Sequence, residues 1–175
     1  MHAWLERSTG LYQDLVAALA RLQPVVLLLF RVWVALVFWR AGVVKFDDPS
    51  GTAALFQHEY HVPLLAPGIA AFLGTWIELV VPWFLAFGLF GRLTALFLFV
   101  YNLMAVISYP ELWPDGFWVG LVGSDFDDHK IWALMLLAVI AWGPGLFSVD
   151  GIVARFWRGG SQINSVGHND RMRNC

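Results

Sequence analysis

The sequence APGIAAFLGTWIELVVPWFLAFGLF, residues 66–90, contains one charged side chain, Glu78, in 25 consecutive residues. A helix of about 20 mostly apolar residues is long enough to cross the hydrocarbon of a bilayer, and it satisfies its own backbone hydrogen bonds there. Three other segments are long and largely apolar, at about 24–46, which contains Arg31, Arg40 and Lys45, and at about 93–109 and 131–149, which contain no charged residue. The sequence therefore predicts four transmembrane helices.

The composition of the whole chain also indicates a membrane protein. Of its 175 residues, 59% are hydrophobic and 14% are charged, compared with about 45–50% and about 25% in soluble domains. The formal net charge of -2 creates no strong field for nucleic acid. A single cysteine, Cys175, excludes an intrachain disulfide and a Cys-x-x-Cys redox pair. We expect the lipid bilayer as a partner, and no nucleic acid.

The segments that flank the predicted spans complete one membrane domain, residues 1–158. Leucines at helical spacing predict an amphipathic helix at about 9–22 that lies on the membrane surface. Residues 159–175 are polar and are expected to form a flexible tail. The expected fold is all-α: four transmembrane helices in an antiparallel bundle, with an N-terminal amphipathic surface helix.

The positions of the basic residues predict the orientation of the chain. Most of them lie before the first span, between the second and third spans, or after the fourth: Arg7, Arg21, Arg92, Arg155, Arg158, Arg171 and Arg173. The two other loops are longer and mainly acidic. By the positive-inside rule, both termini are therefore expected in the cytoplasm.

Glu78 is expected near the middle of the bilayer, about 18 Å from either end of its span. An arginine partner would keep this carboxylate ionised there. Arg31 and Arg40 lie in the first span, and we expect Arg31 to be the partner because Arg40 can extend to the interface. Such a pair either fixes helix packing or forms a proton or substrate site, and the sequence leaves both readings open.

Other polar groups lie at a depth similar to that of Glu78. Trp76 is close to it in the second span, and Asn102 occupies the third. With Arg31, these residues could line an apolar pocket with converging polar groups, into which a quinone ring would fit. The alternative is that Pro82 kinks the second span and Asn102 only bonds neighbouring helices.

Histidines and an aspartate in the two acidic loops form a candidate metal site. His58 and His61 share one face if the stretch is helical, and Asp128 and His129 add ligand atoms from the other loop. Imidazole and carboxylate groups bind copper or zinc. The alternative is that these histidines only lie at the membrane rim.

Four motifs follow one another along the predicted spans. They are Arg31, Gly42 and Lys45; Glu78 followed by Gly88-Leu89-Phe90-Gly91-Arg92; Asn102-Leu103-Met104-Ala105; and Gly143-Pro144-Gly145-Leu146-Phe147-Ser148-Val149-Asp150. Over about 25–153, this order resembles the DoxX family of small four-helix membrane proteins. Tyr109 stands where many members have a His, and Asp128-His129-Lys130 where others have a Glu.

The resemblance implies a redox setting in the inner membrane of a bacterium. Some family members are subunits of a quinone-reducing thiosulfate oxidoreductase, and others belong to complexes that handle oxidative stress or to systems with small metal-binding peptides. We expect a subunit or accessory protein of a quinone-linked redox or oxidative-stress system, whose protein partner carries the redox centre. This chain would be at most a subunit of a membrane oxidoreductase.

Two other functions remain open. One is a non-enzymatic component of copper handling, associated with a small metal-binding peptide. The other is a small proton-coupled transporter, built around Glu78 as a homodimer.

Overall fold

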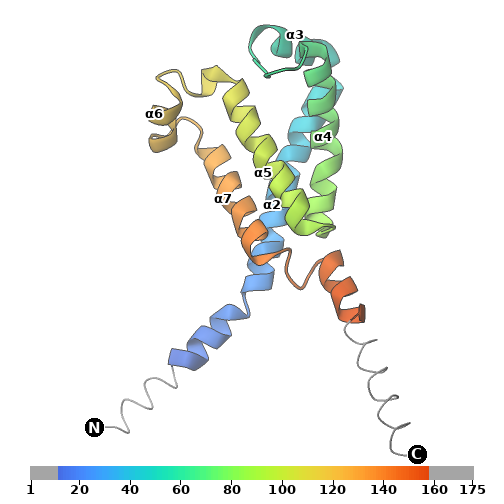
Figure 1. Cartoon of the computed structure of the whole chain (residues 1–175), viewed down its shortest axis with the longest axis vertical. Helices are drawn as coiled ribbons and strands as arrows, with labels where there is room; N and C mark the ends of the chain where they lie inside the picture. Colours follow the sequence, from blue (N-terminus) through green and yellow to red (C-terminus); the bar gives the residue numbers. More distant parts are fainter. Residues whose placement is uncertain (1–11, 158–175) are drawn as a thin grey trace, which may run out of the picture.

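The computed structural model describes residues 12–157, in which every regular element is helical (Figure 1). This confirms the all-α class. The elements are α2 (Gln23–Asp47), α3 (Pro49–His58), α4 (Pro67–Phe87), α5 (Gly91–Ser108), the 3₁₀ helix η1 (Pro110–Leu112), α6 (Phe117–Val122) and α7 (Asp127–Trp142). Residues 12–20 and 149–157 are also helical.

Within residues 12–157, three helices are long and apolar enough to cross a membrane. They are Tyr12–Asp47, Pro67–Phe87 and Gly91–Ser108, which overlap the first three predicted spans. The first of them joins α2 to residues 12–20, which were predicted as part of a separate surface helix, through a turn at residues 21–22. The segment predicted as a fourth span, 131–149, is helical only as far as Trp142. The helix ends there because Gly143 has a φ of 83° and a proline follows it.

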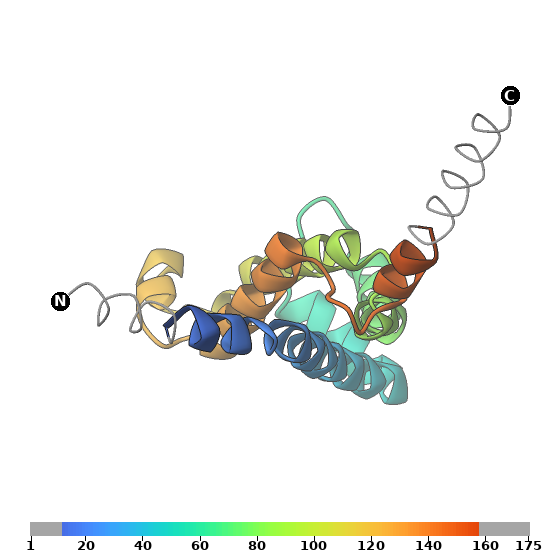
Figure 2. The ribbon, with the colours of Figure 1, turned by 90° about the horizontal axis from the view of Figure 1, so that it is seen from below.

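The four long helices, α2, α4, α5 and α7, run alternately up and down and pack along one another (Figure 1). The closest packing joins α2 to α4 and α5 to α7. We call the end with α3, η1 and α6 the loop end, and the opposite end, with residues 12–20 and 149–157, the terminal end. Viewed from below, the two flanking helices extend from the long helices in different directions (Figure 2).

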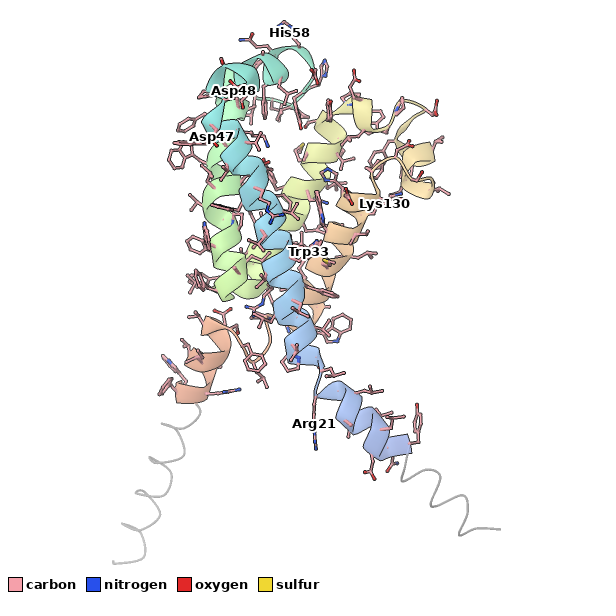
Figure 3. All side chains as sticks on the ribbon, turned by 180° about the vertical axis from the view of Figure 1, so that it is seen from behind. Arg21, Trp33, Asp47, Asp48, His58 and Lys130 are labelled. Atoms are coloured by element: carbon pink, nitrogen blue, oxygen red, sulfur yellow. The ribbon has the colours of Figure 1, made fainter. Side chains whose placement is uncertain are left out.

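Side chains from all four long helices form the core. They are Leu27, Val34, Phe38, Leu85, Ala95, Leu98, Leu136 and Val139. Many large apolar side chains face outward instead, as Trp33 does halfway along α2 (Figure 3). A helix that is apolar on both its inner and outer faces suits an environment of lipid.

The loop end is folded back onto α4. Asp48 ends α2 and caps α3, because its carboxylate accepts a hydrogen bond from the backbone N–H of Gly51 at 2.8 Å. Residues 59–66 then return to α4, and the N–H of His61 donates to the carbonyl of Ser108 at 2.7 Å. This segment therefore covers the loop end of α4 and α5.

The terminal end is held by the segment that follows α7. The carboxylate of Asp150 accepts hydrogen bonds from the N–H groups of Phe90 and Gly91, at 3.0 and 2.7 Å. These are free donors at the start of α5, so Asp150 caps that helix from a distance in sequence. Residues 12–20 are exposed throughout. The rest of the predicted surface helix, 9–11, and the predicted tail, 159–175, lie outside the described residues.

Candidate functional site

Glu78 is paired with Lys45, and the expected pairing with Arg31 is wrong. Lys45 Nζ lies 2.5 Å from Glu78 Oε2, and the two side chains are only 14% and 7% exposed. Arg31 lies 14 positions earlier in α2, which is about 21 Å along a helix. Arg31 and Lys45 therefore cannot both lie at the depth of Glu78. The way α2 is aligned along α4 places Lys45 there.

Gly42 sets this register. A Cβ atom at Gly42 would lie 2.9 Å from the Cβ and the carbonyl carbon of Glu78 and from the backbone nitrogen of Leu79. Real Cβ atoms do not approach so closely, so any other residue would push the two helices apart. Small residues permit such close approach of helices within a membrane. Gly42 therefore brings α2 against α4 at the position of Glu78.

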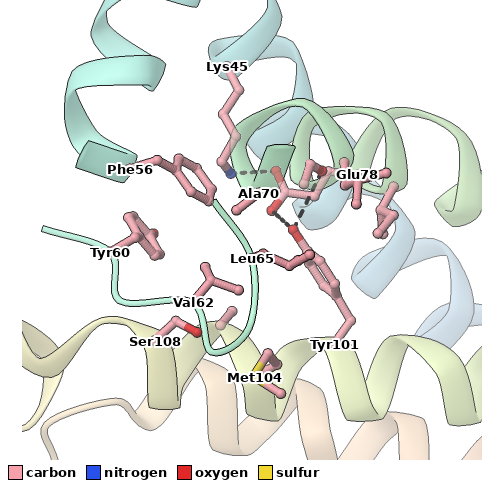
Figure 4. Close-up of a pocket in the computed structure, with 14 residues that line it drawn as sticks. Lys45, Phe56, Tyr60, Val62, Leu65, Ala70, Glu78, Tyr101, Met104 and Ser108 are labelled. Atoms are coloured by element: carbon pink, nitrogen blue, oxygen red, sulfur yellow. Dashed lines mark hydrogen bonds and ion pairs between the residues drawn. The ribbon is translucent and has the colours of Figure 1, made fainter. Parts of the chain in front are cut away.

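Tyr101 of α5 is the second partner of Glu78. Its hydroxyl donates to Glu78 Oε1 at 2.8 Å, so both carboxylate oxygens have a donor (Figure 4). Tyr101 was not predicted as a site residue, although it is the one tyrosine in the middle of the third predicted span. A hydroxyl at that depth needs a hydrogen-bond partner, and this requirement was the signal that could have identified it.

The Lys45–Glu78–Tyr101 cluster lines a cavity of about 170 Å³ between α3, α4 and α5. The walls are mainly apolar and include Phe56, Val62, Leu65, Ala70 and Met104. Ser108 lies across the cavity from Glu78 (Figure 4). Its hydroxyl is buried and has no hydrogen-bond partner among residues 12–157. The cavity thus combines an ion pair, the hydroxyl-bearing side chains of Tyr60, Tyr101 and Ser108, and an apolar interior.

Stacked aromatic rings lie at the loop end of this cavity. Tyr60 stacks on Phe56 at 4.7 Å and on Tyr109 at 4.8 Å between ring centroids. Tyr109 donates its hydroxyl proton to Glu59 at 3.1 Å. Burial, and then the negative charge of Glu78, raise the pKa of Tyr60 to about 12. Both effects keep the Tyr60 hydroxyl protonated at neutral pH.

Of the four residues expected to line a pocket together, only Glu78 lines this cavity. Trp76 is 46% exposed and packs against Phe46 and Phe72 on the outer surface. Asn102 faces α7, where it bonds with His129. The sequence placed these residues at a similar depth, but depth alone does not specify the face of a helix.

Arg31 lies at the terminal end, where it is completely buried. It donates a hydrogen bond to the carbonyl of Phe147 at 2.5 Å. The Nη1 atom of Arg31 lies against Gly88. A Cβ atom added at Gly88 would clash with it. Arg31 therefore holds the segment after α7 against the turn between α4 and α5.

The last of the four motifs, Gly143–Asp150, lies around Arg31. Pro144 packs against Gly91, where an added Cβ would lie 2.5 Å from the proline ring. Gly145 has a φ of 80°, which favours glycine, and Ser148 donates to its carbonyl at 2.6 Å. With Asp150 at the start of α5, these residues form the contacts of the terminal end and lie outside the cavity.

The residues expected to bind a metal do not form one group in the described part of the chain. His58 ends α3, so His61 does not continue its helical face, and the His61 ring bonds to the carbonyl of Glu59 at 3.0 Å. Asp128 is exposed, whereas His129 is paired with Asn102. Within the part of the chain that the structure describes, no three or more His, Cys, Asp and Glu side chains form a metal-binding group.

The chain was compared with known families, proteins and structures. No curated protein and no solved structure matches it. The family model DoxX matches residues 26–110, which include Gly42, Lys45, Glu78 and Tyr101. By this match, residues 26–110 are similar to the DoxX family of membrane proteins.

Proposed function

We propose that this protein is a membrane subunit or accessory protein of a quinone-linked redox system, and that it binds a quinone in the Lys45–Glu78–Tyr101 cavity. The observation that carries the proposal is the Lys45–Glu78 ion pair, which lines an apolar cavity. Charges within apolar surroundings are costly and commonly mark functional sites in membrane proteins. The quinone site is thus moved from the predicted Arg31 and Asn102 to Lys45 and Tyr101.

The size and walls of the cavity suit one aromatic ring. An engineered apolar cavity of about 150 Å³ is known to bind benzene, and this cavity measures about 170 Å³. Phe56, Val62 and Met104 offer apolar contacts to the faces of a ring. A longer isoprenoid tail would have to leave the cavity toward the lipid.

The polar groups suit the carbonyl oxygens of a quinone. A lysine ammonium has three donors, and one of them faces Glu78. Another can donate to a quinone oxygen on the cavity side, and the unpartnered hydroxyl of Ser108 can donate to a second oxygen. A molecule with an oxygen at each end of a flat ring would satisfy both donors.

The ion pair is also suited to the chemistry of quinone reduction. Two electrons and two protons convert a quinone into a quinol, and negative charge develops on the oxygens as the electrons arrive. Lys45 would stabilise this charge, while Glu78 would keep the ammonium oriented. Both protons would be taken up from water at the open side of the cavity. The electrons would come from a protein partner that carries the redox centre.

The proposal includes a position in the membrane. We infer that α7 is the fourth span of an antiparallel bundle in the inner membrane of a bacterium. Its 16 residues cover about 24 Å, so the segment after Trp142 would complete the crossing. Both termini would be cytoplasmic, residues 12–20 would lie on the membrane surface, and the cavity would open toward the outer side.

Quinone binding to the purified protein in nanodiscs tests the proposal. We expect decylubiquinone or a short-chain menaquinone to quench tryptophan fluorescence saturably. Lys45→Met should raise the Kd at least about 10-fold, because the charged donor to the quinone oxygen is lost. Glu78→Gln should also raise the Kd, because the Lys45 ammonium is no longer held in position. Glu111→Gln is the matched control, since Glu111 is exposed and does not line the cavity. Failure of the wild-type protein to bind either quinone, or equal affinity in all variants, would refute the proposal.

A further inference from the structure

His129 and Asn102 form a doubly bonded pair between α7 and α5. The amide nitrogen of Asn102 donates to the backbone carbonyl of His129 at 2.9 Å. The amide oxygen of Asn102 lies 2.8 Å from Nδ1 of the His129 ring. Both halves of one amide are thus engaged by one residue.

This pairing determines the tautomer of the imidazole. A carbonyl can only accept, so the NH₂ group of Asn102 must face the backbone of His129. The amide oxygen then faces Nδ1 and also can only accept, so Nδ1 must carry a proton. In the neutral ring, Nε2 is therefore the unprotonated nitrogen and a hydrogen-bond acceptor. No residue in the described range 12–157 donates to it.

His129 lines a second cavity, of about 360 Å³, between α5, α6 and α7. The side chains of Phe99, Phe117 and Phe126 form aromatic walls. Phe117 and Phe126 stack at 5.7 Å between ring centroids. Leu103, Leu134 and Leu137 also line the cavity and are exposed on the outer surface of the helices, so the cavity borders the region where lipid would lie.

The other polar side chains around this cavity are occupied. The Lys130 ammonium donates to the carbonyls of Gly120, Leu121 and Gly123 and pairs with Asp127. Lys130 thereby holds α6 against the start of α7, near the position labelled in Figure 3. Asn102 uses both of its amide groups on His129. This leaves Nε2 of His129 as the acceptor available to a ligand.

We infer that this cavity is a binding site for a lipid-soluble phenol, whose hydroxyl donates to Nε2 of His129 while its ring lies among Phe99, Phe117 and Phe126. The free acceptor selects a ligand with a hydroxyl donor, and the aromatic walls select a flat ring. A ring needs about 150 Å³, so the remaining volume holds a short alkyl chain directed toward the lipid. This site is separate from the Lys45–Glu78–Tyr101 cavity and does not depend on the function proposed there.

A pair of matched ligands tests this inference on the full chain in nanodiscs. The phenol 4-propylphenol and its methyl ether, 4-propylanisole, have the same ring and chain, but only the phenol has a donor. We expect the phenol to bind about 3- to 10-fold more tightly, which is the usual effect of one hydrogen bond. With ¹⁵N-labelled histidine, the Nε2 resonance of His129 should be that of an unprotonated nitrogen and should shift when the phenol binds.

Variants then assign the effect to His129. His129→Phe keeps an aromatic ring and should abolish the preference for the phenol over the ether. His58→Phe is the matched control, because His58 is exposed and lines neither cavity. Equal affinity of the wild-type protein for the two ligands, or a protonated Nε2 in the free protein, would overturn the inference. These two measurements need no variant, so they decide the question even if His129→Phe does not fold.

Discussion

Lys45 and Glu78 form an ion pair between α2 and α4, three residues along α2 from the glycine that lets the two helices touch. The pair and the contact depend on each other. Gly42 brings the backbone of α2 against Glu78, and this approach allows the side chain of Lys45 to reach the carboxylate. Both are expected to be needed for the cavity beside them.

Gly42→Ala should separate α2 from α4 at Glu78. The new Cβ would lie 2.9 Å from backbone atoms of α4, which cannot move without the whole helix. Overpacking of this kind costs about 1–3 kcal/mol, and denaturant unfolding in detergent measures it. Gly68→Ala is the control, because an added Cβ at Gly68 meets nothing within 4 Å. Equal stability of the two variants would show that the contact at Gly42 is not tight.

Removing one member of the ion pair should destabilise the protein more than removing both. Lys45→Met leaves the Glu78 carboxylate buried without its cation, and such a change costs about 3–5 kcal/mol. The double variant Lys45→Met with Glu78→Gln leaves no unpaired charge and should recover much of this loss. Unfolding of the wild type, both single variants and the double variant gives the coupling energy. Additive effects would mean that the pair is not energetically coupled.

Loss of the Asp150 carboxylate should release the segment after α7 from the start of α5. Asp150→Ala removes the acceptor for the N–H groups of Phe90 and Gly91, and loss of a helix cap costs about 0.5–2 kcal/mol. Limited proteolysis between α7 and residue 157 should become faster. Asp150→Asn retains one acceptor oxygen and should have a smaller effect. Unchanged cleavage in the alanine variant would contradict the capping role.

Tyr60 should titrate later than an ordinary tyrosine. Its pKa is raised to about 12 by burial and by the charge of Glu78, whereas an unfolded tyrosine titrates near 10. Since the folded state holds this proton more tightly, its contribution to stability is complete below about pH 10 and is lost as the pH rises toward 12. Absorbance of tyrosinate near 295 nm, compared with Tyr60→Phe, measures the transition.

Glu78 provides an internal check on this titration. Glu78→Gln removes the second cause of the raised pKa, so the Tyr60 transition should move to lower pH but stay above 10, because burial remains. A Tyr60 transition near pH 10 in the wild-type protein would show that the ring is accessible to water.

Local signals explain why much of the fold could be predicted. Long apolar runs identified α2, α4 and α5. The predicted fourth span continued to about residue 149, whereas the helix ends at Trp142. Gly143 and Pro144, which end the helix, are visible in the sequence. There the apolar character of the segment was given more weight than its helix-ending residues.

The candidate site was predicted less well, because it depends on which faces of the helices meet. Glu78 was correctly singled out as an unusual intramembrane charge, and Lys45 was noted as part of a motif. Their partnership, and the part played by Tyr101, required the register of α2, α4 and α5. Asn102 was expected beside Glu78 but faces His129 on the neighbouring helix.

By itself, the sequence determined that this chain consists of apolar helices with few charges, because helix length, polarity and helix-ending residues are properties of neighbours along the chain. Only the tertiary structure decided which basic side chain forms an ion pair with Glu78. A helix offers several faces at any depth, and the choice among them is made where two helices come close enough to touch. Here that place is Gly42, and it selected Lys45 in place of Arg31 as the partner of Glu78.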